Sequence, residues 1–185
     1  MWLIAKAWYY RYFRDMNDAQ APSFPARDHD HSACLNRAVQ RAKRRCEEVD
    51  IKWTKLREKV FRQIATSHTA VRAYDLGASL TKEGNPIAPI SIYRILEVLK
   101  EAGLVHRLES RNAFFACMTA HENARQTITF ICRDCDRVTE IGAPGAYGAI
   151  GEATEAAGFT LGTVLIEVGG LCGECREGRG DGALT

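Results

Sequence analysis

Two C-x-x-C pairs are the residues of this chain best suited to chemistry. Cys132 and Cys135 stand in "FICRDCDRVTEI", and Cys172 and Cys175 stand in "GGLCGECREG". Each pair places two thiols on one tight turn, and two such turns beside predicted strands can present four sulfurs at the corners of a tetrahedron. Zinc suits that set, because it binds four thiolates as a closed structural site and has no redox chemistry of its own.

Other uses of these cysteines fit less well. A thioredoxin-like C-x-x-C occurs as a single pair in a βαβ context, and a stable disulfide framework does not suit a reducing cytosol. An enzyme using zinc-bound water needs an open coordination position beside a general base, which a closed four-thiolate site does not supply. A redox switch, in which the thiols form disulfides and release zinc, is the alternative to a structural zinc that joins the two ends of a small domain.

A second group of metal-ligating residues lies between the C-x-x-C pairs and the basic part of the chain. His106 and Cys117 are on the two arms of a predicted hairpin, His121 follows four residues later, and Glu122 and Glu140 are nearby candidates. A mixed nitrogen, sulfur and oxygen set suits zinc better than iron(II) or manganese(II), which favour nitrogen and oxygen ligands. An isolated histidine is usually a surface or hydrogen-bonded residue, so this site depends on the fold bringing the group together.

The elements before these residues predict a winged helix-turn-helix. Apolar residues at steps of three and four predict helices over about 35–49, after Thr54, over 69–80 and over "SIYRILEVLKEAG", where Ser91 is the expected cap. The runs "LVHRLE" and "AFFAC" around "SRN" predict a hairpin. In such a fold the last helix enters the major groove, so Ser91, Tyr93 and Arg94 near its start are the candidate DNA contacts.

The rest of the chain changes in pattern and in charge. "TITFIC", "RVTEI" and "TLGTVLIEVGGLC" are typical of strands, and "GAYGAIGEATEAAG" of a helix, so the protein is predicted to be α+β, with a winged helix-turn-helix followed by a small α/β domain. Residues 37–111 contain 16 Lys and Arg against 9 Asp and Glu, whereas residues 112–185 contain 5 against 10. That asymmetry favours double-stranded DNA as the partner of the first part, although a basic face can also be merely solvated.

The chain ends and the location of the protein follow from composition. We expect residues 1–35 to be a flexible extension, 36–116 the winged-helix domain, 117–176 the second domain and 177–185 a flexible tail. Within the extension, "DHDHSAC" with His29, His31 and Cys34 is interpreted as a polar lead-in, with an accessory metal-binding tail as the alternative. No apolar run approaches the roughly 18 to 20 residues of a membrane helix, so a cytoplasmic protein without a membrane partner is expected.

Taken together, these motifs resemble the ferric uptake regulator family, and within it most closely the branch that regulates zinc uptake. The resemblance covers about residues 36–176 and rests on "LREKVFRQI", "SIYRILEVLKEAGLVHRLES", "AFFAC", "FICRDCDRVTE" and "GFTLGTVLIEVGGLCGEC". It implies a homodimer with an N-terminal winged helix and a C-terminal dimerisation domain. It also implies a repressor of metal-uptake genes, active when metal is bound, with no small-molecule substrate and no enzyme activity.

The resemblance also implies which residues bind metal. The structural zinc site of the family corresponds to the four cysteines of the two C-x-x-C pairs. The regulatory zinc site corresponds to His106, Cys117, His121 and Glu140, although in one subgroup the position of the loop histidine would be Arg125. The iron-sensing branch carries a His-rich "HHDH"-like stretch where this chain has "TAHENAR". That difference and Cys117 favour zinc over the alternatives of iron, manganese or peroxide sensing.

Overall fold

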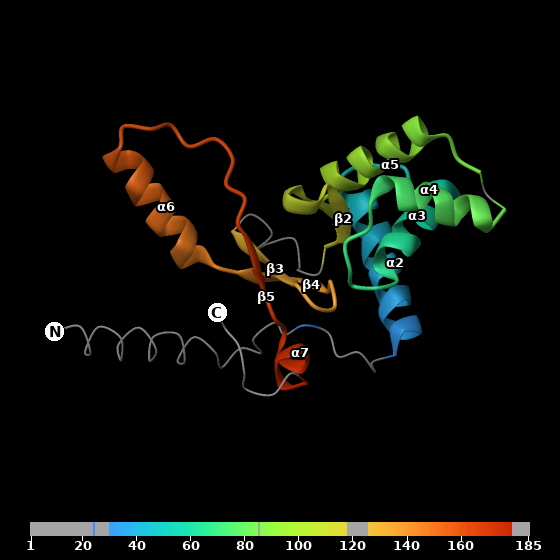
Figure 1. Ribbon diagram of the computed structural model, residues 1–185. Coiled ribbons are helices and arrows are strands. Elements are labelled where there is room, and N and C mark those ends of the chain that lie inside the picture. Colours follow the sequence, from blue (N-terminus) through green and yellow to red (C-terminus); the bar gives the residue numbers. More distant parts are fainter. Residues whose placement is uncertain (1–23, 25–29, 85, 118–125, 179–185) are drawn as a thin grey trace.

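The computed structural model describes residues 24, 30–84, 86–117 and 126–178, and it has a helical region on one side of a small sheet (Figure 1). The N-terminal elements are α2 (His31–Glu48), α3 (Lys55–Ala65), α4 (Ala73–Lys82), α5 (Pro89–Glu101), β1 (Val105–Leu108), a 3-10 turn (Glu109–Arg111) and β2 (Ala113–Ala116). The C-terminal elements are β3 (Thr127–Cys132), β4 (Val138–Gly142), α6 (Pro144–Ala156), β5 (Glu167–Gly170) and α7 (Gly173–Glu177). This order confirms the predicted α+β class.

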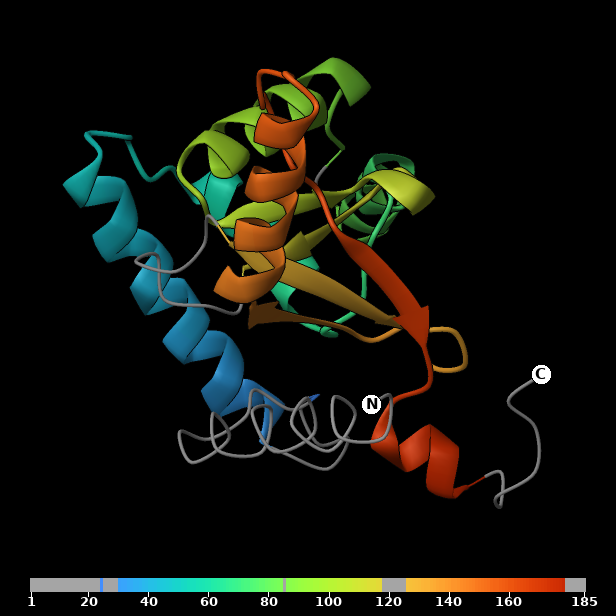
Figure 2. The same cartoon turned by 90° about the vertical axis from the view of Figure 1, so that its left-hand side faces the viewer.

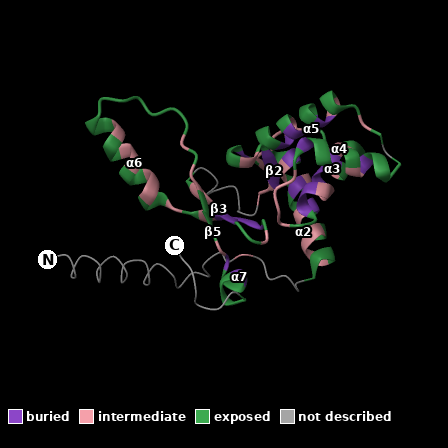
Figure 3. Cartoon of the chain, in the orientation of Figure 1, coloured by how far each residue is buried: buried purple, intermediate pink, exposed green. Residues whose placement is uncertain are grey.

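The helices are held together by the apolar stripes that their sequences predicted. Each of α2 to α5 contributes buried side chains to one hydrophobic core, in which Leu96 and Leu99 of α5 are completely buried. Burying a leucine side chain contributes roughly 1.5–3 kcal/mol, so α5 is held rigidly against its neighbours. Figure 3 shows this concentration of buried residues in the helical region and, by contrast, its absence from α6.

Helix α2 begins earlier than the sequence predicted. Its first residue is His31, so the last residues of the expected flexible extension are helical. The reason is a cap, because the Asp30 carboxylate accepts hydrogen bonds from the backbone N–H groups of Ser32 (3.0 Å) and Ala33 (3.1 Å). Asp30, which stands in a polar segment typical of a loop, is therefore the N-cap of this helix.

Helix α5 also starts differently, and the predicted capping role of Ser91 is wrong. The N-cap is Ala88, and Pro89 occupies the first helical turn, where its fixed φ suits a helix and its missing N–H costs nothing. Ser91 lies inside the first turn and donates its backbone N–H to the Ala88 carbonyl at 2.9 Å. Tyr93 and Arg94 are exposed, as their position off the apolar stripe predicted.

The third helix is shorter than predicted, because the residues before it pair with the wing. Val71 exchanges two backbone hydrogen bonds with Phe114 of β2, at 2.7 and 2.8 Å, and Thr69 bridges Arg137. Helix α4 therefore begins at Ala73 instead of at Thr69. This segment connects the helical region both to the hairpin and to the C-terminal sheet.

The hairpin of β1 and β2 confirms the predicted wing. The strands are antiparallel, with His106 opposite Phe115, and the 3-10 turn between them ends at Asn112 in the left-handed conformation (φ 47°). Asparagine tolerates that conformation better than most residues, which explains the turn at "SRN".

The C-terminal sheet has the order β4-β3-β5, with β3 antiparallel to β4 and parallel to β5. Strand β5 is shorter than the predicted run "TLGTVLIEVGGLC", because only Glu167–Gly170 finds partners on β3. The residues from 159 to 166 have no regular structure. Figure 1 shows α6 projecting away from the sheet, and in Figure 2, seen from that side, α6 is at the front. This helix has no buried residue. In the described ranges, no helix is long and apolar enough to span a membrane.

Candidate metal centres

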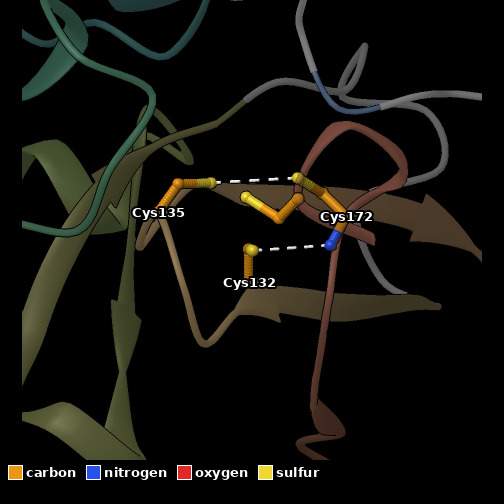
Figure 4. A group of neighbouring side chains, drawn as sticks. Cys132, Cys135 and Cys172 are labelled. Atoms are coloured by element: carbon orange, nitrogen blue, oxygen red, sulfur yellow. Dashed lines mark hydrogen bonds between the residues drawn. The ribbon is translucent and has the colours of Figure 1, made fainter. Parts of the chain in front are cut away.

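The four cysteines of the C-x-x-C pairs come together at one end of the small sheet. Cys132 ends β3, Cys135 lies in the following turn, Cys172 caps α7 and Cys175 lies within it (Figure 4). Their sulfurs all lie within 4.8 Å of one another, and Cys132, Cys172 and Cys175 are buried. Two elements separated by most of the C-terminal region therefore meet at these thiols.

The spacing of the sulfurs fits a tetrahedral ion. Sγ of Cys135 and Sγ of Cys172 are 3.8 Å apart. Two thiolates at about 2.3 Å from one zinc ion in tetrahedral geometry are also about 3.8 Å apart, whereas a disulfide requires about 2.0 Å. Among the described residues, none of the seven cysteines is in a disulfide.

The surroundings of these cysteines favour the ionised thiolate form of some of them, and a bound cation would balance the negative charge. Burial opposes ionisation of Cys135, but hydrogen bonds led by that from Arg137 outweigh it and lower its pKa to about 6. Burial likewise opposes ionisation of Cys132, and backbone N–H groups, first that of Cys172, lower its pKa. Burial, followed by hydrogen bonding, raises the pKa of Cys175. Four thiolates this close repel one another, so a divalent cation among them is what allows all four to ionise.

Arg137 is a part of this centre that the sequence interpretation missed. Its side chain is buried, with Nε 3.2 Å from Sγ of Cys135 and Nη2 3.2 Å from Sγ of Cys172. Nη2 also donates to the Glu174 carboxylate at 2.7 Å. The guanidinium thus offsets the negative charge of the thiolates and orients two of them. The only indication in the sequence that Arg137 supports the site is its position two residues after a C-x-x-C pair, and that indication is weak.

The second group of ligands joins the wing to the sheet. His106 lies on β1, Cys117 directly follows β2 and Glu140 lies on β4, and their ligand atoms are all within 4.8 Å of one another. The backbone N–H of Cys117 donates to the Leu104 carbonyl at 2.9 Å, which fixes the thiol at the end of the hairpin. Residues 118–125, which include His121, Glu122 and Arg125, lie outside the described residues, so the loop ligand stays a prediction.

The environment of His106 fits a metal ion. Its Nε2 atom is buried and makes no hydrogen bond in the described ranges. Oε1 of Glu140 lies 3.5 Å from this nitrogen, which is longer than an ordinary hydrogen bond. A buried, unsatisfied nitrogen beside a buried carboxylate is unfavourable by itself, and a cation bound between them removes the penalty. The ring of Phe115, 5.7 Å away between centroids, holds the imidazole in place.

Two further exposed side chains lie on the elements that carry the predicted DNA contacts or precede them. Besides Tyr93 and Arg94, Tyr74 on α4 and Ile90 on α5 are exposed, with 84% of Tyr74 accessible. Tyr74 and Tyr93 line the same hollow of about 510 Å³ between α4 and α5. Because Tyr74 lies off the apolar stripe of α4, the sequence could have indicated that its side chain is exposed.

Comparison with known proteins agrees with this architecture. The model of the ferric uptake regulator family matches residues 48–169. The zinc uptake regulation protein of Escherichia coli strain K12 is 33% identical over 140 residues, which cover 75% of this chain and 81% of that protein. The zinc uptake regulation protein of Mycobacterium tuberculosis strain H37Rv is 26% identical over 105 residues, which cover 57% of this chain and 79% of that protein.

Two solved structures resemble most of this chain. A zinc uptake regulator complexed with zinc and DNA superposes with a TM-score of 0.72 at 30% identity, covering 78% of this chain and 97% of that chain. The holo form of XcZur superposes with a TM-score of 0.66 at 32% identity, covering 80% of this chain and 99% of that chain. The chain therefore belongs to the ferric uptake regulator family.

Proposed function

We propose that this protein is a zinc-responsive transcriptional repressor that binds operator DNA as a homodimer and controls zinc uptake genes. The observation that carries the proposal is the group of His106, Cys117 and Glu140, which connects the wing to the C-terminal sheet. The E. coli relative is a zinc uptake regulation protein, and one structural neighbour holds both zinc and DNA. A repressor of this kind acts in the cytoplasm, on DNA, and needs no small-molecule substrate or enzyme activity.

Zinc at this group would act on the arrangement of the two regions. His106 and Cys117 belong to the hairpin, Glu140 belongs to β4, and His121 is the proposed loop ligand. An ion bound by all of them favours the arrangement in which they are close, so zinc shifts the population towards it. A shift from 1:99 to 99:1 requires about 5.5 kcal/mol of differential zinc affinity. The thiol of Cys117 favours zinc over iron(II) and manganese(II).

The four-cysteine site would hold a second zinc ion with a different role. Four buried thiolates leave no open coordination position, so this zinc stabilises the C-terminal region and does not sense the metal supply. Because the site forms only when α7 meets the end of β3, zinc binding free energy becomes folding free energy. We place the domains accordingly, with a winged-helix domain up to residue 116 and a zinc-stabilised domain over 117–176.

DNA binding would use the exposed start of α5. In this proposal Ser91, Tyr93 and Arg94 meet bases or phosphates in the major groove, and Tyr74 extends the same face. The excess of Lys and Arg over residues 37–111 supplies phosphate contacts that carry no sequence information. The affinity for DNA should therefore fall steeply as the salt concentration rises. The slope of log affinity against log salt concentration gives the number of phosphates that the protein neutralises.

The homodimer is supported by the exposed apolar surface of the C-terminal region. Helix α6 has no buried residue in the protomer, and Phe159, Leu165 and Val168, which follow it in the chain, are 65%, 66% and 39% exposed. Several large apolar side chains exposed in one region often mark a protein interface, and a second copy of the chain covers them in our proposal. Two copies present two recognition helices to two half-sites of a palindromic operator.

The experiment that tests this function pairs metal analysis with DNA binding. A duplex is first selected from random-sequence DNA by the zinc-loaded protein, and its binding is then measured across buffered zinc, iron(II) and manganese(II). We expect binding that rises with free zinc and with neither other metal. Binding driven by iron(II) or manganese(II), or binding without any metal, would contradict the proposal. Zinc release and thiol loss after mild peroxide, with loss of DNA binding, would favour the redox switch instead.

A further inference from the structure

We propose that His31, Cys34 and His68 form a further binding site for a zinc-class divalent cation at the start of α2. These residues belong to neither metal centre described above, and the inference goes beyond the proposed function. His31 and Cys34 are part of the "DHDHSAC" segment, which the regulatory mechanism leaves without a role. His68 reaches them from the loop between α3 and α4.

The distance between Cys34 and His68 suits two ligands of one ion, and His31 lies beside them. Sγ of Cys34 is 3.7 Å from Nε2 of His68. A thiolate at about 2.3 Å and an imidazole nitrogen at about 2.0 Å from a tetrahedral zinc ion are roughly 3.5 Å apart. The ring centroids of His31 and His68 are 5.4 Å apart, and two imidazoles bound tetrahedrally to one zinc have centroids about 5 Å apart.

The backbone positions each of the donors. Cys34 follows His31 by three residues in α2, so their side chains share one helix face. His68 has a left-handed backbone (φ 47°), which is uncommon for a residue with a side chain. Its carbonyl accepts a hydrogen bond from the backbone N–H of Val138 at 2.8 Å, which holds this conformation in place. An unusual backbone that presents an imidazole to a thiol is a reason to look for function.

The site is partly assembled. In the part of the chain that the structure describes, only the two centres above have three or more ligand atoms within 4.8 Å of one another. The exposed ring of His31 therefore has to turn a nitrogen towards Cys34 when the ion binds.

The donor set and exposure define the ligand and its affinity. One thiolate and two imidazoles suit zinc or cobalt(II) and leave a fourth position for water. With three ligands, one of them exposed, this site should fill at higher free zinc than the four-cysteine site. Cys34 and His68 also line a cavity of about 30 Å³ together with Cys117, so the site adjoins a ligand of the regulatory group.

The test counts zinc ions bound by the full-length protein at equilibrium with saturating buffered zinc. Cys34→Ser and His68→Asn should each bind one zinc ion fewer per protomer than the unaltered chain. Asparagine tolerates the left-handed backbone of residue 68 and has no imidazole, so His68→Asn removes the ligand while keeping the turn. Ser32→Ala alters the same helix turn without touching the three ligands and should lose no zinc.

The zinc count distinguishes this site from the proposed regulatory site. Cys117→Ser removes the regulatory zinc alone, and the Cys34→Ser/Cys117→Ser double variant should lose two ions. An unchanged zinc count in Cys34→Ser or in His68→Asn overturns the proposal, and so does an equal loss in Ser32→Ala. A Cys34→Ser variant that loses one ion while Cys117→Ser loses none would support this site and contradict the regulatory one.

Discussion

Nε2 of His106 and Oε1 of Glu140 face each other at 3.5 Å, although one belongs to the wing and the other to the C-terminal sheet. Cys117 completes the group from the other arm of the wing. The residues that we propose as metal ligands are thus also residues that join two parts of the fold. Any ion bound between them stabilises one relative arrangement of those parts, which is the physical requirement for a metal-controlled DNA-binding protein.

Arg137 should control how tightly the four-cysteine site holds zinc. Arg137→Met keeps much of the side-chain volume but removes the guanidinium that donates to Cys135 and Cys172. We expect about 10- to 100-fold weaker zinc binding, the usual cost of losing a residue that supports metal ligands. Competition with a chelator of known affinity measures it. Arg133→Met, on the exposed side of the same turn, is the control and should bind zinc normally.

Glu167 should connect the sheet to the tip of the wing. Its carboxylate accepts hydrogen bonds from the backbone N–H groups of Glu109 (2.7 Å) and Ser110 (3.1 Å). Glu167→Gln removes the charge that strengthens these bonds, at a cost of about 1–2 kcal/mol. We expect roughly tenfold weaker operator binding at saturating zinc, with the zinc content unchanged. Equal binding by Glu167→Gln and by the exposed control Glu155→Gln would show that this contact does not orient the wing.

Glu58 should make the stability of the helical region depend on acidity. The pKa of Glu58 is lowered to about 2, mainly by the hydrogen bond that Trp53 donates to its carboxylate (2.9 Å). Hydrogen bonds from Arg62 and Lys43 lower this pKa further, and burial acts in the opposite direction. Since this pKa is below its usual value of 4.5, the stabilisation is complete above pH 4.5 and is lost as pH falls towards 2.

The corresponding variant is Glu58→Gln. The Glu58 side chain is 24% exposed, so solvent screening limits the effect to about 1–2 kcal/mol lower free energy of unfolding at pH 7. Urea unfolding at pH 7 and at pH 3 should show this difference shrinking in acid. A difference that is the same at both pH values would mean that packing, and not charge, is what the substitution disturbs. Glu47→Gln, an exposed residue of α2, is the control.

Leu165 should lie in the interface of the proposed homodimer. Its side chain is 66% exposed in the protomer, and Leu165→Asp would bury a charge if a second copy covers it. We expect the variant to sediment as a monomer at concentrations where the unaltered chain is a dimer. Ile90→Asp changes a side chain of similar exposure (60%) on α5 and should leave the dimer intact. Dimeric Leu165→Asp would place the interface elsewhere.

The sequence was sufficient for features that depend on local spacing. Apolar stripes predicted the helices, alternation predicted the hairpin, and the spacing of Cys132 with Cys135 predicted a thiol turn. Features that depend on a competing local interaction were missed. Pro89 starts α5 more effectively than Ser91, and the Asp30 cap starts α2 within what appeared to be a polar extension.

Contacts between distant segments were the hardest part to predict. Cys34 and His68 are separated by 34 residues, and Arg137 reaches across to Glu174, so no periodic pattern connects them. The short β5 has a related cause. The apolar run before it satisfies the pattern of a strand, but it lies beyond the segment that pairs with β3.

The most direct test of the central claim is operator binding as a function of free zinc, compared between the unaltered chain and Cys117→Ser. The serine hydroxyl is a far poorer zinc ligand than a thiolate and keeps the size of the side chain. We predict that the variant remains a folded dimer with its four-cysteine zinc and loses zinc-dependent binding to the operator over the range in which the unaltered chain responds. A Cys117→Ser protein that still binds the operator only with zinc, at the same free zinc concentration, would contradict the assignment of the regulatory site.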